Sequence, residues 1–285
     1  MTSTPPLITF IGPGVMAEAM ISGLIRQSVA RPDQIRISGP ETDHNQELQA
    51  HYGVTPFTDN YAAVQSAQVV ILSVKPQRLD RVLDGLKGGL DPEALVLSIV
   101  AGASIQTIQT GLEHSVIVRA MPNTPAQIGE GITVWTASPA VRLEQADLAR
   151  QILRALGTEI QVEEESYLDM ATAVSGSGPA YVFLFLEAMI DAGVHLGLPR
   201  RIAEEMVVQT LRGSVDYFQI NKAHPAHLRN QVTSPGGTSA AALYYLEKAG
   251  FRTAISRAIW AAYERSQELG KGKGSHPPEK TDNSN

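Results

Sequence analysis

Short apolar runs alternate with amphipathic segments through the first half of the chain, and this alternation constrains the fold more than any other feature. Several runs are continuous and rich in β-branched residues, as expected of strands buried on both faces. Strands that alternate with helices predict an α/β domain, a doubly wound and mostly parallel sheet with helices on both faces. The runs are residues 7–11, 35–38, 69–74, 95–100, 116–120, 132–136 and 158–162.

Local signals place helices between these runs. Pro76 is a favourable first helical residue and precedes a segment whose apolar positions fall on one face. Ser104 is a suitable N-cap for the next helix. A further helix is expected over residues 140–156, ending before Gly157.

The strand pattern stops after about residue 163, and helical patterns follow. Pro179 begins a helix that is apolar on nearly every side, so it has to be buried. A second domain of this size cannot cover so much apolar surface, and burial against another subunit is expected. We therefore predict an α/β domain over residues 1–163, an all-α dimerisation domain over 164–270 and a disordered tail over 271–285.

Composition excludes several classes of function. The net charge of −6 provides no basic field for nucleic acid. The absence of cysteine excludes a disulfide framework, a cysteine nucleophile and thiolate metal sites. No secretory leader and no membrane span are expected, so a cytoplasmic protein is predicted. His224 and His227 lie close together without nearby carboxylates, which favours a helix start over a metal site.

A glycine-rich segment follows the first predicted strand directly and precedes a helix. It has the form G-x-G-x-x-A, which is typical of dinucleotide binding, although glycine-rich turns also occur for purely structural reasons. Gly12 permits the tight turn, Gly14 lets the backbone approach a pyrophosphate, and Ala17 allows close helix–strand packing. The predicted phosphate-binding residues are Ile11, Gly12, Pro13, Gly14, Val15 and Met16.

Three further strand ends carry candidate cofactor contacts. Glu41 follows the second strand, where a carboxylate usually holds the ribose 2′-hydroxyl of NAD. Because no arginine follows in that loop, the local pattern slightly favours NAD over NADP; the alternative is a solvated loop residue. Lys75 ends the strand over residues 69–74 and is either a cofactor contact or an ordinary surface charge. The segment Ala101-Gly102 ends the next strand.

Three segments, in this order and spacing, resemble the pyrroline-5-carboxylate reductase family. Together with the glycine-rich segment, the resemblance covers about residues 7–270. The third segment is the most specific. The segments are Met121-Pro122-Asn123-Thr124-Pro125, Ser175-Gly176-Ser177-Gly178-Pro179-Ala180-Tyr181 and Val232-Thr233-Ser234-Pro235-Gly236-Gly237-Thr238.

The resemblance implies a Rossmann domain followed by a helical domain that forms an interlocked homodimer, often assembled further into decamers. It implies reduction of 1-pyrroline-5-carboxylate to L-proline, the last step of proline biosynthesis, with NADPH or NADH as cofactor. The cofactor contacts that it implies beyond the glycine-rich segment are Asn60, Val74, Lys75, Pro76, Val100, Ala101 and Asn123.

The last segment makes chemical sense as a substrate site. Two glycines before a helix let backbone N–H groups converge, and such a nest captures a carboxylate without an arginine. The alternative is a capped loop–helix junction with Thr238 or Ser239 as N-cap. Ser239 is assigned the catalytic hydrogen bond to the imine nitrogen, with Thr238 as the second choice; the family commonly has threonine where Ser239 stands. The predicted substrate contacts are Ser234, Pro235, Gly236, Gly237, Thr238 and Ser239.

Two other functions stay open. A 3-hydroxyacid dehydrogenase has a similar domain order but needs a lysine at the start of its central helix, and this chain has none between Lys87 and Lys222. A non-catalytic dinucleotide-binding scaffold would need no substrate nest. The acidic run of residues 163–165 is interpreted as a solvated turn, with an interdomain hinge or a minor role near the cofactor as the alternatives.

Overall fold

The computed structural model describes residues 6–270, which form two compact units. The first unit contains the described chain up to Ser177 and returns from Ala262 onward; the second is Gly178–Ala261. The predicted domain boundary after residue 163 lies before the observed boundary after Ser177. The short helix over residues 167–171 still packs on the sheet and so belongs to the first unit. The predicted disordered tail lies outside the described residues.

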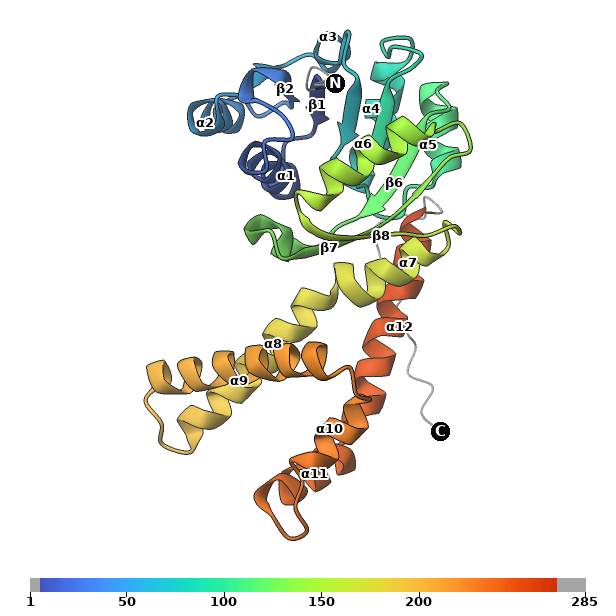
Figure 1. The fold of residues 1–285 in the computed structure, drawn as a ribbon. Coiled ribbons are helices and arrows are strands. Elements are labelled where there is room, and N and C mark those ends of the chain that lie inside the picture. Colours follow the sequence, from blue (N-terminus) through green and yellow to red (C-terminus); the bar gives the residue numbers. More distant parts are fainter. Residues whose placement is uncertain (1–5, 271–285) are drawn as a thin grey trace, which may run out of the picture. The chain divides into compact units, whose positions relative to one another are not determined.

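The first unit is built on one eight-stranded sheet (Figure 1). Its strand order is β3-β2-β1-β4-β5-β6-β7-β8, and every neighbouring pair is parallel except β6 and β7. The predicted mostly parallel, doubly wound sheet is confirmed. The strands are β1 (Ile8–Ile11), β2 (Ile35–Ser38), β3 (Thr55–Phe57), β4 (Val69–Leu72), β5 (Leu95–Ser98), β6 (Ile117–Met121), β7 (Gly131–Ala137) and β8 (Gly157–Gln161).

The sequence pattern missed one strand, β3. It has three residues, contains Pro56 and lies at the edge of the sheet. Proline cannot donate to a strand ladder and is tolerated at such an edge, so neither length nor composition marked this segment as a strand.

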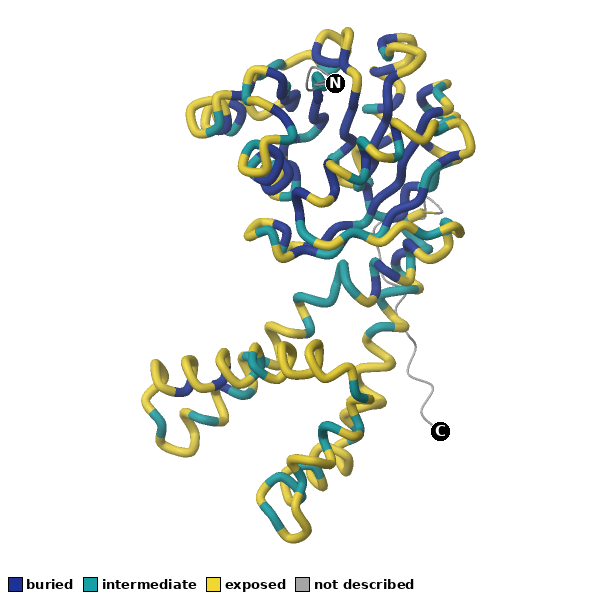
Figure 2. Tube along the Cα trace, viewed as in Figure 1, coloured by how far each residue is buried: buried dark blue, intermediate teal, exposed yellow. Residues whose placement is uncertain are grey.

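Helices cover both faces of the sheet, and each face has its own apolar core. One core joins the strands to α1 (Val15–Arg26), α2 (Thr42–Tyr52) and α6 (Leu143–Arg154). The other joins them to α3 (Asn60–Val64), α4 (Leu79–Leu86) and α5 (Ile105–Leu112). Figure 2 shows the resulting burial, with the central strands β1, β4, β5 and β6 mostly dark blue and the edge strands β3 and β8 more exposed.

The local helix signals are confirmed. Pro76 begins a 3-10 turn that continues into α4, and the Ser104 side chain caps α5 by accepting the Thr107 N–H at 3.1 Å. Helix α6 ends at Arg154, before Gly157. The short elements in this unit are η1 (Pro32–Gln34), η2 (Pro76–Arg78), η3 (Thr124–Ile128), α7 (Tyr167–Ala171) and η4, a π-turn over Thr172–Gly176.

The second unit is helical, as predicted. Its core is small: Ile190, Ala203 and Val207 join the first two helices. Large apolar side chains are exposed in the single chain, among them Phe183 at 62% and Leu184 at 67%. Its helices are α8 (Gly178–His195), α9 (Arg200–Asn221), α10 (Pro225–Gln231), α11 (Thr238–Lys248) and the start of α12 (Phe251–Gly270).

The helical stretch Tyr167–His195 is long and apolar enough to cross a membrane, by length and composition only. Only 11% of its most apolar window is buried inside the chain. Length and composition alone do not distinguish a membrane span from a helix covered by a partner chain.

Candidate functional site

The loops after β1 and β4 meet at the carboxyl edge of the sheet. Strands β2 and β4 flank β1 on opposite sides, so the strand order reverses at this point, where such sheets bind ligands. The Ser73 hydroxyl lies in the loop after β4 and donates to the carbonyl oxygens of Ile11 and Gly12, at 3.1 and 2.9 Å. Ser73, which was not among the predicted residues, therefore ties the predicted glycine-rich segment to the loop that carries Val74.

The loop after β1 has the geometry of a phosphate cradle. Gly12 has a φ of 86°, and a Cβ there would lie 2.4 Å from Val74 Cγ1, so only glycine fits. Gly14 is exposed, a Cβ added to it would meet open space, and it precedes α1 without a side-chain cap. The first N–H groups of α1, at Val15 and Met16, have no partner within the helix. The exposed backbone of Gly14 beside these helix-start amides fits a pyrophosphate.

The end of β2 carries a second polar cluster. The Ser38 hydroxyl is fully buried and donates to Asn60 Oδ1 at 2.7 Å, which fixes the amide of Asn60 beside the strand end. Glu41 is exposed at the N-cap position of α2, and its side chain does not cap the helix. Its carboxylate is therefore open to a ribose hydroxyl. Ser38 was not among the predicted residues, although a polar residue at the end of a parallel strand is a signal for such a role.

The remaining predicted contacts lie along the same edge of the sheet. Lys75 is exposed directly before η2, while Val100 is buried and its N–H donates to the Ser98 hydroxyl at 3.3 Å. Ala101 is half-buried, and Gly102 has a φ of 75°. A Cβ on Gly102 would lie 2.8 Å from the backbone nitrogen of Gly270, so this loop packs directly on the last turn of α12.

Both polar atoms of the Asn123 side chain are hydrogen-bonded to the backbone of other segments. Its Oδ1 accepts the Ile132 N–H at 2.9 Å, and its Nδ2 donates to the Ser175 carbonyl oxygen at 3.2 Å. The second bond holds the π-turn η4, and π-turns of this kind are frequent at functional sites. Asn123 thus positions the segment that carries Ser175 and Ser177. Its contact with the cofactor stays a prediction.

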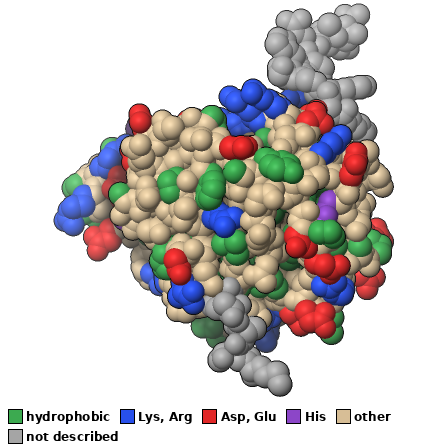
Figure 3. Space-filling view, turned by 90° about the horizontal axis from the view of Figure 1, so that it is seen from above, with side chains coloured by type: hydrophobic (Ala, Val, Ile, Leu, Met, Phe, Trp, Pro, Cys, Tyr) green, Lys and Arg blue, Asp and Glu red, His purple; other side chains and the backbone are tan. Residues whose placement is uncertain are grey.

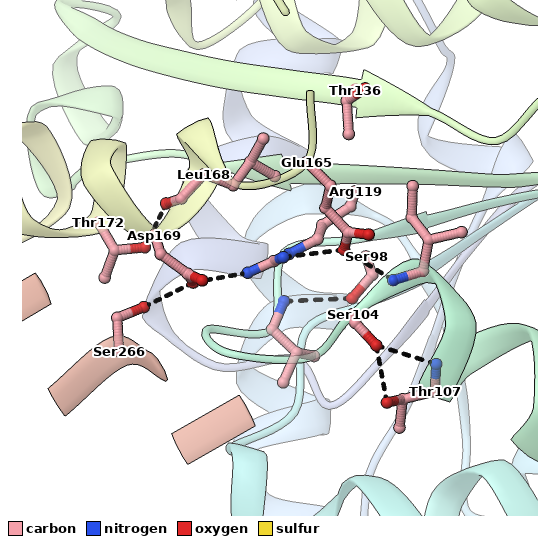
Figure 4. Close-up of polar contacts among 12 residues, drawn as sticks. Ser98, Ser104, Thr107, Arg119, Thr136, Glu165, Leu168, Asp169, Thr172 and Ser266 are labelled. Carbon is pink, nitrogen blue, oxygen red and sulfur yellow. Dashed lines mark hydrogen bonds and ion pairs between the residues drawn. The ribbon is translucent and has the colours of Figure 1, made fainter. Parts of the chain in front are cut away.

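A partly buried ionic network lies beside the loop after β5 (Figure 4). Arg119 on β6 is 5% exposed and pairs with Glu165 at 2.8 Å and with Asp169 of α7 at 3.1 Å. Glu165 also accepts the N–H of Ile105, the first residue of α5, at 2.8 Å. Asp169 accepts the hydroxyl of Ser266, on α12, at 2.9 Å.

The interpretation of residues 163–165 as a solvated acidic turn is wrong for Glu165. Its carboxylate joins β6 to the start of α5, because a buried arginine requires a charged partner. The sequence contained one signal for this network. Arg119 is a charged residue within a strand buried on both faces, and such a charge has to be paired.

The predicted substrate segment lies in the second unit and forms a turn that leads into α11. Gly236 has a φ of 72°, and the N–H of Gly237 donates to the Ser234 carbonyl oxygen at 3.0 Å. Gly237 is the N-cap of α11 and no side chain caps the helix. The alternative that Thr238 or Ser239 is the N-cap is therefore wrong, since both lie inside the first turn. The helix-start amides remain available to an anion.

The histidine pair is a helix start, as interpreted. His224 is the N-cap of α10, and its Nδ1 accepts the Ala226 N–H at 3.2 Å. Within residues 6–270, no group of three or more histidine or acidic side chains could hold a metal ion. The face seen in Figure 3 carries basic and acidic side chains interspersed.

Comparison with known proteins gives consistent findings over nearly the whole chain. A family model for pyrroline-5-carboxylate reductase dimerisation matches residues 165–269. A model described as NADP oxidoreductase, coenzyme F420-dependent, matches residues 7–102. The chain is 47% identical over 261 residues to a pyrroline-5-carboxylate reductase of Synechocystis, covering 92% of this chain and 97% of that protein.

Two solved structures have the same architecture. One is Plasmodium falciparum pyrroline carboxylate reductase with NADP bound, with a TM-score of 0.86 and 31% identity over 93% of this chain and 98% of that one. The other is a pyrroline-5-carboxylate reductase from Coxiella burnetii, with a TM-score of 0.84 and 36% identity over 93% of this chain and 99% of that one.

We expect Arg119→Met to lower the free energy of unfolding by about 1–3 kcal/mol, because it leaves two partly exposed carboxylates without their shared cation. Arg142→Met is the control, since Arg142 pairs with Glu93 on the surface and such pairs contribute little. Urea denaturation at one protein concentration measures both variants. Equal unfolding midpoints for the two variants would contradict the importance of the ionic network.

We expect Gly12→Ala and Gly14→Ala to differ. Gly12→Ala strains a positive φ and collides with Val74, so both the thermal midpoint and NADPH binding should fall. Gly14→Ala has an ordinary φ of −88° and open space, so it should leave the midpoint nearly unchanged and weaken NADPH binding alone. Thermal denaturation and fluorescence titration measure the two effects. Wild-type NADPH affinity in Gly14→Ala would show that the pyrophosphate does not approach this loop.

Proposed function

The chain belongs to the pyrroline-5-carboxylate reductase family, and we propose that it reduces the carbon–nitrogen double bond of 1-pyrroline-5-carboxylate to give L-proline with NADPH or NADH. The observation that carries the proposal is the pair of uncapped, glycine-preceded helix starts in one chain. One, at α1, suits a dinucleotide pyrophosphate, and the other, at α11, suits a small carboxylate.

We assign the cofactor to the carboxyl edge of the sheet. Its pyrophosphate would lie on the residues from Ile11 to Met16, and its adenosine ribose near Asn60 and Glu41. The nicotinamide side would follow Val74, Lys75 and Pro76, then Val100 and Ala101, with Asn123 nearby. When bound, the reduced nicotinamide supplies a hydride. Catalysis of this kind depends on holding the cofactor and the imine carbon in reach of each other and on excluding water.

We assign the substrate carboxylate to the segment from Ser234 to Ser239. The positive φ of Gly236 turns the backbone before α11, so the first N–H groups of the helix are available to an anion. The Ser234 hydroxyl is exposed and can donate to the same carboxylate. No arginine is required, because helix-start amides supply both donors and positive dipole character.

We assign the polar catalytic role to Ser239, with Thr238 as the second choice. Ser239 is half-buried in the first turn of α11, while Thr238 is exposed. An imine is more basic than a ketone and can bind already protonated, so a strong general acid is unnecessary. The Ser239 Oγ would accept the N–H of the protonated ring nitrogen and hold the proton there while the carbon is reduced.

A 3-hydroxyacid dehydrogenase function has less support. That chemistry needs a lysine at the start of the central helix, and the segment over residues 88–221 contains none. A non-catalytic scaffold does not account for the uncapped start of α11. Imine-dependent turnover would exclude the scaffold directly.

We propose that the helical unit forms a homodimer and that dimers assemble further into a decamer of a cytoplasmic enzyme. Its large apolar side chains are exposed on several helices, not on one alone. Examples are Leu184 on α8, Met206 on α9 and Tyr245 on α11. The charged side chains of α9 and α12 between such residues favour a protein partner over lipid. A second copy of the chain supplies the complementary apolar surface.

The function is tested by following NADPH and NADH oxidation at about 340 nm with purified protein and pyrroline-5-carboxylate, with a keto acid as control. We expect oxidation only with the imine. The ratio of kcat/KM for the two cofactors then shows whether Glu41 favours NADH. No imine turnover by folded protein that binds nucleotide would exclude the reductase assignment.

We expect Ser239→Ala to lower kcat by about 10- to 100-fold, because it removes a hydrogen bond to a charged nitrogen. The dissociation constant for NADPH should not change. Thr238→Ala is the matched variant and should have a smaller effect. If Thr238→Ala proves the more damaging of the two, the polar role belongs to Thr238.

We expect Leu184→Arg to shift the protein toward monomers, because it places a charge in an apolar surface that a partner covers. Leu143→Arg is the control, since Leu143 is 74% exposed on α6 in the other unit. Light scattering coupled to size-exclusion chromatography measures both masses. An unchanged mass for Leu184→Arg would place the interface elsewhere.

A further inference from the structure

The first turn of α2 contacts the phosphate loop through a side chain that the proposed site does not use. His44 Nε2 lies 2.7 Å from the Pro13 carbonyl oxygen. A carbonyl oxygen only accepts hydrogen bonds, so Nε2 carries the proton and donates it. Glu47 lies one turn further along α2, with its Oε2 3.6 Å from His44 Nδ1, on the other side of the ring. The imidazole thus joins α2 to the loop through its Nε2 donor, and the Glu47 carboxylate lies beyond hydrogen-bond distance.

This bond fixes a peptide plane at the centre of the loop. The Pro13 carbonyl lies outside the hydrogen-bond ladder of α1, whose first acceptor is the Gly14 carbonyl bonded to Glu18 N–H at 2.9 Å. At the other end of the same peptide, the Gly14 N–H donates to the Gly12 carbonyl oxygen at 2.8 Å. With both polar groups of the Pro13–Gly14 peptide bonded, the turn has one orientation, and the next amides are left for a ligand.

The neighbouring residue holds the neighbouring loop. Asn45 is 3% exposed, and its Nδ2 donates to the Gly39 carbonyl oxygen at 2.9 Å. The two loops touch, because a Cβ on Gly39 would lie 2.8 Å from Pro13 Cδ. Consecutive residues of one helix therefore set the spacing between the phosphate loop and the end of β2.

Helix α2 is also bonded to α1 at a point distant from the phosphate loop. At its far end the Tyr52 hydroxyl donates to Glu18 Oε1 on α1 at 3.1 Å. Burial, followed by the bond to Glu18, raises the pKa of Tyr52, so the hydroxyl stays protonated as a donor at neutral pH. This contact docks α2 on α1 without touching the phosphate loop, which makes Tyr52 a control for the general docking of the helix.

We propose that His44 is a positioning residue for the dinucleotide: its hydrogen bond to Pro13 holds the phosphate loop in the shape that receives the pyrophosphate. Preorganisation of this kind raises affinity because the loop does not have to be ordered on binding. The inference rests on the proposed function only in taking a nicotinamide dinucleotide as the ligand.

The test compares variants that keep or lose the donor. In His44→Gln the side-chain amide reaches the place of Nε2 and keeps the bond, whereas in His44→Asn the shorter amide falls short of Pro13. His44→Leu is a second variant without the donor, in case His44→Asn does not fold. Tyr52→Phe removes the distant contact between α1 and α2. Calorimetry without substrate gives the dissociation constants for NADPH and NADH, and circular dichroism checks the folding of each variant.

We expect His44→Asn and His44→Leu to raise the dissociation constant by about three- to tenfold, as the loss of one hydrogen bond does. His44→Gln and Tyr52→Phe should bind as the wild type does, and kcat at saturating NADPH should be unchanged in His44→Asn. Wild-type affinity in His44→Asn overturns the proposal. Equal losses in His44→Gln or in Tyr52→Phe also overturn it, because the effect would then come from packing or from helix docking.

The readout separates this proposal from the proposed function. A wild-type protein that binds NADPH but does not reduce pyrroline-5-carboxylate contradicts the reductase function and leaves the binding comparison valid. A folded wild-type protein that binds neither nucleotide overturns both.

Discussion

The close approach of the loops after β1 and β4 is the constraint on which the candidate cofactor site depends. Gly12 lies so near Val74 that any side chain would collide, and the Ser73 hydroxyl bridges the same two loops. This contact directs the chain into α1 with its first amides exposed. The loop after β1, the loop after β2 at Gly39 and the first turn of α2 are joined by hydrogen bonds from His44 and Asn45.

A second constraint ties the last part of the chain to the sheet. Arg119 is buried and has to be neutralised, and its partners come from the segment after β8 and from α7. Through Asp169 the same network reaches Ser266, where the chain has returned to the first unit. The loop after β5 is held from both sides, by Glu165 at the start of α5 and by the last turn of α12 at Gly102.

The helical unit is under a different constraint, since its own core contains few side chains. The contacts of Ile190, Ala203 and Val207 cover only one side of α8 and α9. Large apolar side chains of both helices therefore stay exposed in the single chain, among them Leu184 and Met206. This agrees with the match of residues 165–269 to a dimerisation domain. The stability of this unit is therefore expected to depend on its assembly.

The sequence by itself determined the alternation of strands and helices, the glycine turn between β1 and α1 and the helical second half. Those features depend on local periodicity and on glycine positions, which a single chain displays directly. Seven of the eight strands were predicted; β3 was not, because three residues with Pro56 carry no periodic signal. The family resemblance came from segments such as the one from Val232 to Thr238, which are also local.

Only the tertiary structure decided which distant residues meet. Glu165 pairs with Arg119 and His44 bonds to Pro13, and each pair is separated by tens of residues in the chain. Hydrogen bonding in the folded chain also assigned Asn123 to the π-turn and left the start of α11 without a side-chain cap. Periodicity reports which face of an element is buried but not which polar groups face it from another element. That choice is made when the elements pack and every buried donor and charge has to find a partner.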